Sequence, residues 1–113
     1  MPQNRKNLID LFIGNLSNAI VHEIMEKATE NKEIASHYKK EVENSLKISK
    51  KYRSKINPIN AVLSEKDIGY IKKKLVNKVK SKLKERILEG YENINLDLIE
   101  ELVNKTLRET KIS

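Results

Sequence analysis

The sequence predicts a single all-α domain, residues 1–113, in which four helices form a bundle. Apolar residues recur with a helical period along nearly the whole chain, and no segment of useful length alternates with a period of two. The length of 113 residues is enough for one domain with its own hydrophobic core. The chain contains only three Gly and two Pro, which leaves little material for the tight turns of a β fold.

The first helix is expected at about residues 4–28. Eleven of the eighteen residues in the range 8–25 are apolar, which is far more than one stripe of a helix. A helix that is apolar nearly all round must be covered on several sides, either as the central helix of the bundle or as the contact with a second subunit. Its narrow polar strip holds Asn15, Asn18 and His22, which either form a solvent-exposed edge or pair across a subunit interface.

The second helix is expected at about residues 32–55, with an apolar face at helical spacing and lysines opposite. Thr29 and Asn31 are suitable N-cap residues, which favours a break between the first two helices. The alternative is one continuous helix, because the apolar faces stay in phase and no Gly or Pro intervenes. Such a helix would be ~75 Å long, whereas a compact chain of this size has a radius of gyration of ~13 Å. The sequence therefore favours the break, since an unbroken helix requires an extended dimer.

The dipeptide Asn57-Pro58 is expected to end the second helix, because proline disfavours helical geometry in the residue before it. Ser64 and Asp67 then have the spacing of a capping box, with Asp in place of the usual Glu. This pattern predicts the start of a third helix over about residues 65–89.

Gly90 stands where a left-handed C-terminal cap of the third helix belongs. The dipeptide Ile94-Asn95 is typical of a hydrophobic staple followed by an N-cap. It predicts a fourth helix over about residues 96–109, whose acidic first turns and Arg108 near the end suit the helix dipole.

The composition excludes several classes of chemistry. Without cysteine the chain has no disulfide, no Cys-ligated metal and no thiol nucleophile. With one Phe, four Tyr and no Trp, aromatic stacking has a small part. No stretch approaches eighteen uninterrupted apolar residues, and no small-residue cleavage site follows the apolar N-terminal stretch. We therefore expect no membrane partner, no signal peptide and a cytoplasmic location.

The net charge of +7 is unevenly distributed along the chain. Residues 37–63 and 64–90 each carry an excess of five positive charges, whereas residues 1–36 and 91–113 are slightly acidic. Lysines that neutralise phosphates are typical of a surface that binds polyanions. The candidate contacts with a polyanion are Lys47, Lys50, Lys51, Arg53, Lys73, Lys80 and Lys84.

Other features of the sequence favour an ordinary solvated surface. Lysine outnumbers arginine by nineteen to four, and no aromatic residues interleave the lysines to stack on bases. Helix-turn-helix, zinc-finger and RNA-binding signatures are absent from the sequence. A further alternative is that the acidic outer helices pair with the basic inner ones, within the domain or across a dimer.

No catalytic residue, cofactor or metal site is predicted, and the chain is not expected to be an enzyme. The sharpest chemical hypothesis joins the first two helices in a hairpin that turns near residues 31–32. It places His22 level with Glu41, and Glu26 level with His37. Di-iron bundles use Glu and His three residues apart, whereas the spacing here is four, which salt-bridged surface pairs explain without a metal.

The leading functional hypothesis is a non-catalytic helical module that mediates protein interactions by self-association, as a homodimer. The excess of apolar surface on the first helix motivates it. The alternative is sequence-independent binding of nucleic acid through the lysine-rich second and third helices. The candidate residues of the oligomer interface are Leu8, Leu11, Phe12, Asn15, Val21 and Met25.

Overall fold

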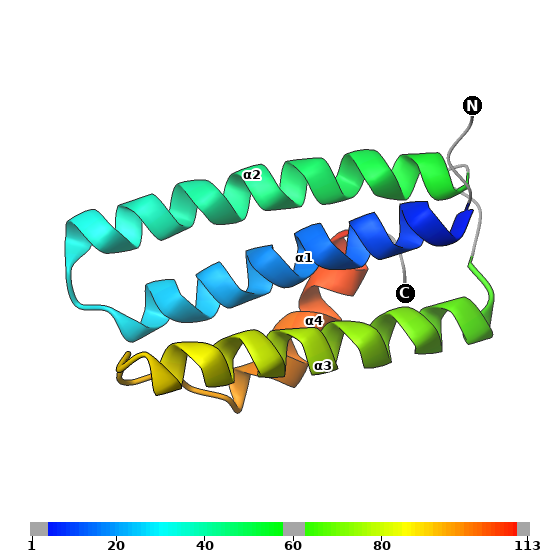
Figure 1. Ribbon diagram of the computed structural model, residues 1–113. Coiled ribbons are helices and arrows are strands. Elements are labelled where there is room, and N and C mark those ends of the chain that lie inside the picture. The colour runs from blue at the N-terminus through cyan, green and yellow to red at the C-terminus, as the bar shows by residue number, and fades with distance from the viewer. Residues whose placement is uncertain (1–4, 58–62, 111–113) are drawn as a thin grey trace.

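The computed structural model describes residues 5–57 and 63–110. Within these residues it contains four helices and no strand, which confirms the all-α, four-helix bundle-like fold. Three long helices lie along the molecule and a shorter fourth crosses them (Figure 1). The helices are α1 (Arg5–Ala28), α2 (Lys32–Ile56), α3 (Glu65–Leu88) and α4 (Leu98–Glu109).

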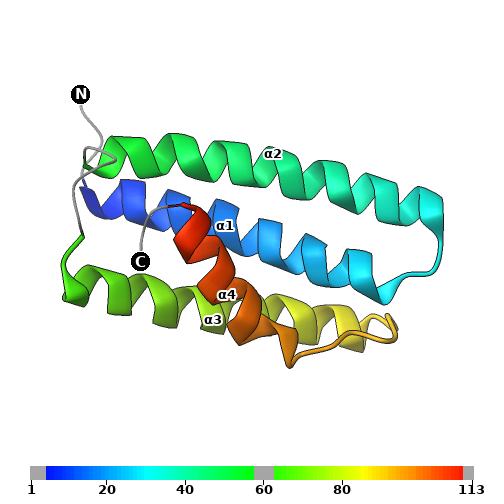
Figure 2. The same ribbon diagram turned by 180° about the vertical axis from the view of Figure 1, so that it is seen from behind.

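The central helix of the bundle is α1. It contacts each of the other three helices, with α2 and α3 on opposite sides and α4 packed against both α1 and α3 (Figure 1 and Figure 2). Phe12, Leu16 and Ile20 of α1 are completely buried, as are Leu75 and Leu83 of α3. Of the two roles predicted for the apolar first helix, the structure therefore has the central one, because one chain covers it on several sides.

By length and composition, α1 also qualifies as a helix that could cross a membrane. Of the eighteen-residue apolar window that meets this criterion, 61% is buried inside the chain. Burial of this extent is what the core helix of a globular bundle requires. Packing within the chain thus accounts for the apolar composition of α1.

The break between α1 and α2 is confirmed. Asn31 is the N-cap of α2, and its Oδ1 accepts hydrogen bonds from the backbone N–H groups of Glu33 at 3.0 Å and Ile34 at 3.1 Å. The Oγ1 of Thr29 accepts from the backbone N–H of Asn31 at 3.2 Å, so both predicted capping residues hold the turn. The molecule measures 41 × 25 × 23 Å, which is far shorter than one unbroken helix would require.

Because α2 returns along α1, the third helix runs in the same direction as the first (Figure 1). Contacts between α1 and α3 join Arg5 to Asp67 and Asn18 to Lys82, which are separated by 62 and 64 positions in the sequence. A residue of α1 therefore lies level with the residue of α3 about 63 positions later. This parallel arrangement brings the first halves of α1 and α3 to one end of the molecule.

Most predicted helix ends are confirmed. Asn57 is extended after the last residue of α2, and the Oγ of Ser64 accepts from the backbone N–H of Asp67 at 3.2 Å. Gly90 has a φ of 101°, as a left-handed cap requires. Pro58 and the predicted first residue of the chain's first helix, residue 4, lie outside the described residues.

The predicted start of the fourth helix is wrong by two residues. The Oδ1 of Asn95 accepts from the backbone N–H of Asp97 at 3.0 Å, and the backbone N–H of Leu98 donates to the carbonyl of Asn95 at 3.3 Å. Asn95 therefore closes a tight turn, and regular α-helix begins only at Leu98. Asn95 has the residue type of an N-cap, but its side chain serves the turn that precedes the helix.

Candidate functional site

Most of the candidate interface residues lie inside this chain's own core. Leu8, Phe12, Val21 and Met25 are each at most 8% exposed. Among the six candidates only Leu11, at 37%, presents a large apolar surface to solvent. The excess apolar surface that motivated self-association is thus covered by the other helices of the same chain.

The polar strip of α1 is half-buried, and its side chains have partners within the chain. The Nδ2 of Asn15 donates to the backbone carbonyl of Leu11 at 2.8 Å. The Oδ1 of Asn18 accepts from the Nζ of Lys82 at 2.5 Å, and burial lowers the pKa of this lysine. The strip is therefore a half-buried seam that joins α1 to its neighbours, between the two situations predicted from the sequence.

Glu41 of α2 bridges the two histidines of the chain. Its Oε2 lies 3.1 Å from the Nε2 of His22, and its Oε1 lies 3.0 Å from the Nε2 of His37. The predicted level of His22 with Glu41 is therefore confirmed. His37 pairs with Glu41 on its own helix, rather than with Glu26 of α1. Within residues 5–57 and 63–110, no group of three or more His, Asp or Glu side chains is arranged to hold a metal ion.

The His22 ring is largely buried, and this burial lowers its pKa. The Glu41 carboxylate opposes the shift, whereas Arg86, Lys82 and His37 add to it. The ring stacks on Tyr38 with 5.8 Å between centroids, and its Nδ1 is buried without a hydrogen-bond partner. His22 is therefore held as the neutral imidazole, with its Nε2–H donated to Glu41.

This environment predicts that acid destabilises the protein through His22. An unfolded histidine titrates at about 6.5, and the folded protein takes up this proton only at lower pH. The free energy of unfolding therefore falls as the pH drops through about 6.5, until the folded histidine is also protonated. Urea denaturation at about pH 7.5 and about pH 5.5 should show a smaller decrease for His22→Gln than for the wild type. An equal decrease in the two proteins would refute this role for His22.

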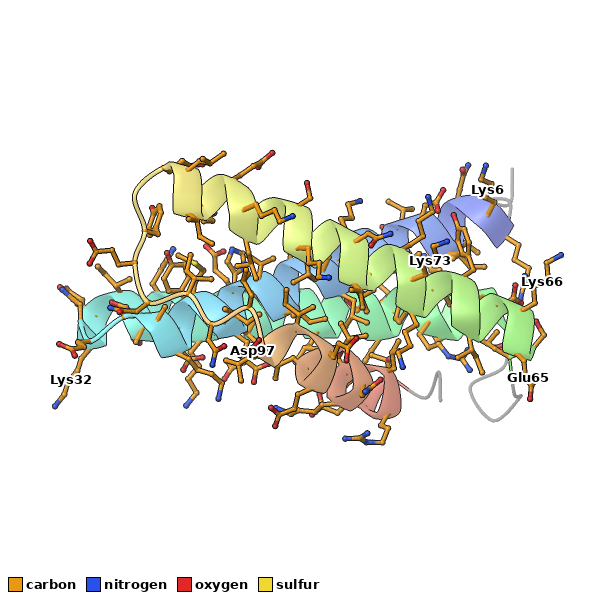
Figure 3. All side chains as sticks on the ribbon, turned by 90° about the horizontal axis from the view of Figure 1, so that it is seen from below. Lys6, Lys32, Glu65, Lys66, Lys73 and Asp97 are labelled. Carbon is orange, nitrogen blue, oxygen red and sulfur yellow. The ribbon has the colours of Figure 1, made fainter. Side chains whose placement is uncertain are left out.

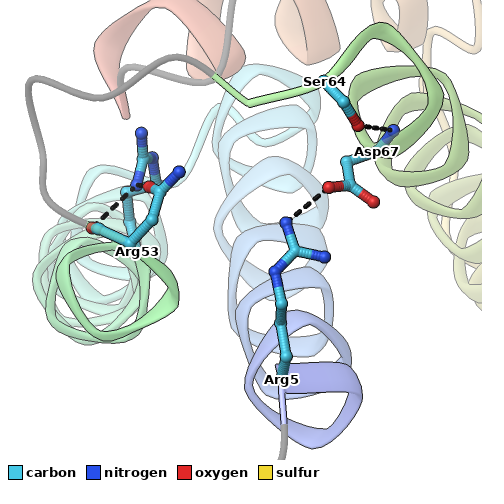
Figure 4. A network of polar contacts seen from close by, with 5 residues as sticks. Arg5, Arg53, Ser64 and Asp67 are labelled. Carbon is cyan, nitrogen blue, oxygen red and sulfur yellow. Dashed lines mark hydrogen bonds and ion pairs between the residues drawn. The ribbon is translucent and has the colours of Figure 1, made fainter.

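Arg53 is a correction to the candidate polyanion surface. It is only 1% exposed, and its Nη1 donates to Oδ1 of Asn57 at 2.5 Å and to the backbone carbonyl of Asn57 at 3.4 Å (Figure 4). The other six candidates are exposed to solvent. These six lysines are Lys47, Lys50 and Lys51 on α2, and Lys73, Lys80 and Lys84 on α3.

The six exposed lysines do not form one continuous ridge, because α2 and α3 lie on opposite sides of α1. The helix directions instead gather charge at one end of the molecule. We define the basic end as residues 5–16, 47–57 and 63–79, which lie level with one another along α1, α2 and α3. These residues include twelve Lys or Arg and three Asp or Glu, whereas the opposite end, residues 17–46 and 80–92, has eight and nine. Figure 3 shows Lys6 and Lys66 together at the basic end and Lys32 at the other.

The carboxylates of the described residues leave the lysines of α2 and α3 unpaired. The ion pairs between helices join Arg5 to Asp67, His22 to Glu41, and Lys105 to Glu23. None of these pairs uses a lysine of α2 or α3. The acidic outer helices therefore do not neutralise the basic inner ones within this part of the chain, which removes one alternative to a polyanion surface.

The Arg5–Asp67 pair ties α1 to the first turn of α3 (Figure 4). The hydrogen bond from Arg5 lowers the pKa of Asp67 and raises that of Arg5. Lys105 and Glu23, 3.1 Å apart, tie α4 to α1 in the same way, and this contact raises the pKa of Lys105. One of the three carboxylates at the basic end is thus occupied by an arginine.

A hollow between α1 and α3 is the feature that sequence reasoning missed. The ammonium groups of Lys6, Lys74 and Lys78 line it. The spacing of Lys74 and Lys78 places them on one flank of a helix, but their approach to Lys6 depends on the parallel packing of α1 and α3. Comparison of the chain with models of known protein families finds no match, and no curated protein or solved structure is significantly similar to it.

Proposed function

We propose that this protein is a non-catalytic helical module that binds the phosphate backbone of nucleic acid without reading its sequence. The observation that carries the proposal is the basic end, with twelve basic side chains against three carboxylates. Among the described residues, no lysine of α2 or α3 forms an ion pair with a carboxylate. Such lysines are free to neutralise phosphates and to release the counterions bound to them.

The chemistry of the basic end favours backbone contacts over base contacts. Its exposed cations are almost all lysines, which act as point charges, whereas base edges are read mainly by the planar fork of arginine. Arg53 is withdrawn from the surface and Arg5 is engaged by Asp67. Two of the four tyrosines, Tyr52 and Tyr70, already lie under Lys55 and Lys74, at 5.7 and 5.8 Å from ring centroid to ammonium nitrogen. Both observations support binding without sequence preference.

The test compares two triple variants that lose the same charge at opposite ends. Lys47→Ala, Lys51→Ala and Lys73→Ala together remove three cations from the basic end. With a labelled duplex and a single strand, each of about 20 nucleotides, the variant should bind about tenfold more weakly, and its salt dependence should fall by about three contacts. The control replaces Lys32, Lys39 and Lys40 with alanine, and should lose about twofold or less.

Fluorescence anisotropy between about 50 and about 300 mM KCl provides the measurement. Absence of binding to both probes at the lowest salt would overturn the proposal. Equal losses in the two triple variants would also overturn it, because net charge alone would then explain the binding. Tighter binding to anionic lipid vesicles than to either probe would assign the basic end to a membrane surface instead.

Self-association remains a second proposal, on a different surface from the one predicted. Leu88 is 88% exposed, and Ile87, Tyr91 and Leu96 nearby in the sequence are 42%, 43% and 37% exposed. These apolar side chains occur at the end of α3 and in the segment that leads to α4, away from the basic end. A second copy of the chain would cover them. A monomer in sedimentation equilibrium at high micromolar concentration would contradict this proposal.

A further inference from the structure

The hollow between α1 and α3 gathers three cations around one carboxylate. It measures about 660 Å³ and opens to solvent. Lys6 comes from the first turns of α1, whereas Lys74 and Lys78 come from successive turns of α3. Asp10 is the only carboxylate on its lining. The lining therefore has a net positive charge and is shared by two helices.

The side chains on the α3 wall of the hollow lie across α1. The Nζ of Lys78 is 3.8 Å from the position that a Cβ atom of residue 14 would occupy, so the lysine lies over Gly14 of α1. The Nζ of Lys74 lies 5.8 Å from the centroid of the Tyr70 ring. These contacts distinguish the two lysines from Lys73 and Lys80, which are exposed and do not line the hollow.

Neutral hydrogen-bond donors complete the lining. The hydroxyl of Tyr70 donates to the Oδ1 of Asp10 at 3.4 Å, which ties the one carboxylate to the wall of α3. The amide of Asn77 and the hydroxyl of Ser81 also line the hollow. Lysines bind phosphates as point charges, and hydroxyl and amide groups donate to the remaining phosphate oxygens.

We propose that this hollow binds a group of adjacent phosphates, as in inorganic triphosphate. Three ammonium groups from two helices suit an anion with several charges, because a single phosphate has too few oxygens to engage them all. The source of the group is either a free polyphosphate or the 5′-triphosphate end of an RNA. The site goes beyond the proposed function, since it depends on Lys6, Lys74 and Lys78 and not on the lysines of α2.

The experiment titrates the full chain with inorganic triphosphate at about 150 mM KCl, by isothermal titration calorimetry. The double variant Lys74→Ala, Lys78→Ala should bind about tenfold more weakly or worse, because it removes two of the three cations. The control Lys73→Ala, Lys80→Ala loses the same charge from the same helix, and should change the affinity about twofold or less. Circular dichroism checks that each variant keeps its helices.

A third variant gives an effect of the opposite sign. Asp10→Asn removes the only carboxylate of the lining and keeps an amide oxygen for the Tyr70 hydroxyl. It should tighten triphosphate binding by about twofold to fivefold, because the repulsion between two anions is lost. Neither a loss of folding nor a general change of surface charge at a remote position would reproduce this gain together with the loss in Lys74→Ala, Lys78→Ala.

Two oligonucleotides distinguish the sources of the ligand. Tighter binding of a 5′-triphosphate RNA than of the same RNA with a 5′-hydroxyl would support an RNA end, and equal binding of the two RNAs beside tight triphosphate binding would support a free polyphosphate. No binding of millimolar triphosphate, or equal losses in the two double variants, would overturn the site. The triple variant at Lys47, Lys51 and Lys73 should keep its triphosphate affinity. A failure of backbone binding is therefore separable from a failure of this site.

Discussion

Replacing Phe12 with alanine is expected to lower the free energy of unfolding by about 3–5 kcal/mol. Phe12 is the only phenylalanine of the chain and is completely buried in α1, among side chains of the central core. The variant loses the transfer free energy of the ring and leaves a cavity that its neighbours fill only in part. Since a domain of this size is stabilised by about 5–15 kcal/mol, the loss is a large share of the total.

Urea denaturation followed by circular dichroism measures this effect, with Leu88→Ala as the control. Leu88 is 88% exposed, so its truncation should change the free energy of unfolding by about 0.5 kcal/mol or less. The loss in Phe12→Ala should be the same at about 2 and about 200 µM protein, because Phe12 packs within one chain. A loss that appears only at the higher concentration would return Phe12 to an interface between subunits.

Replacing Arg53 with alanine is expected to lower the free energy of unfolding by about 2–4 kcal/mol. The side chain is 1% exposed, and burial lowers the pKa of its guanidinium. Truncation removes its hydrogen bonds to Asn57 at the end of α2, and also leaves unfilled volume. Lysine neighbours of the same charge on the exposed side of α2 have no such contacts in the described residues.

Lys51→Ala is the matched control for Arg53→Ala, since both remove one positive charge from the same turn and a half of α2. Its effect on urea denaturation should be about 0.5 kcal/mol or less. If Arg53→Ala left the stability unchanged and weakened nucleic-acid binding as much as Lys51→Ala, Arg53 would belong to the surface after all.

Local sequence signals predicted the helices closely, because their causes lie within a few residues. Asn31 and Ser64 cap α2 and α3 through hydrogen bonds to backbone groups two or three residues ahead. Gly90 adopts the positive φ that ends α3. The start of α4 was misplaced for an equally local reason, since an Asn side chain serves a turn as readily as a helix N-terminus.

The candidate site was predicted less well, and Arg53 explains why. Its charge grouped it with Lys50 and Lys51, but it lies four residues after Ser49, which is completely buried against α1. Helical spacing thus placed Arg53 beside the inner face, and this signal could have identified it. Which neighbour would receive its guanidinium could not be read from the pattern, because that depends on how α2 packs.

The sequence by itself determined the helical fold, the helix boundaries to within two residues and the chemistry that a chain without cysteine lacks. Only the tertiary structure decided where the apolar and charged surfaces lie. Four helices cover α1 within one chain, so its apolar excess became core. The charges that divided into inner and outer helices along the chain divide in space into two ends, because α2 runs opposite to α1 and α3. Burial and electrostatic potential depend on distances between residues far apart in sequence, and packing alone sets those distances.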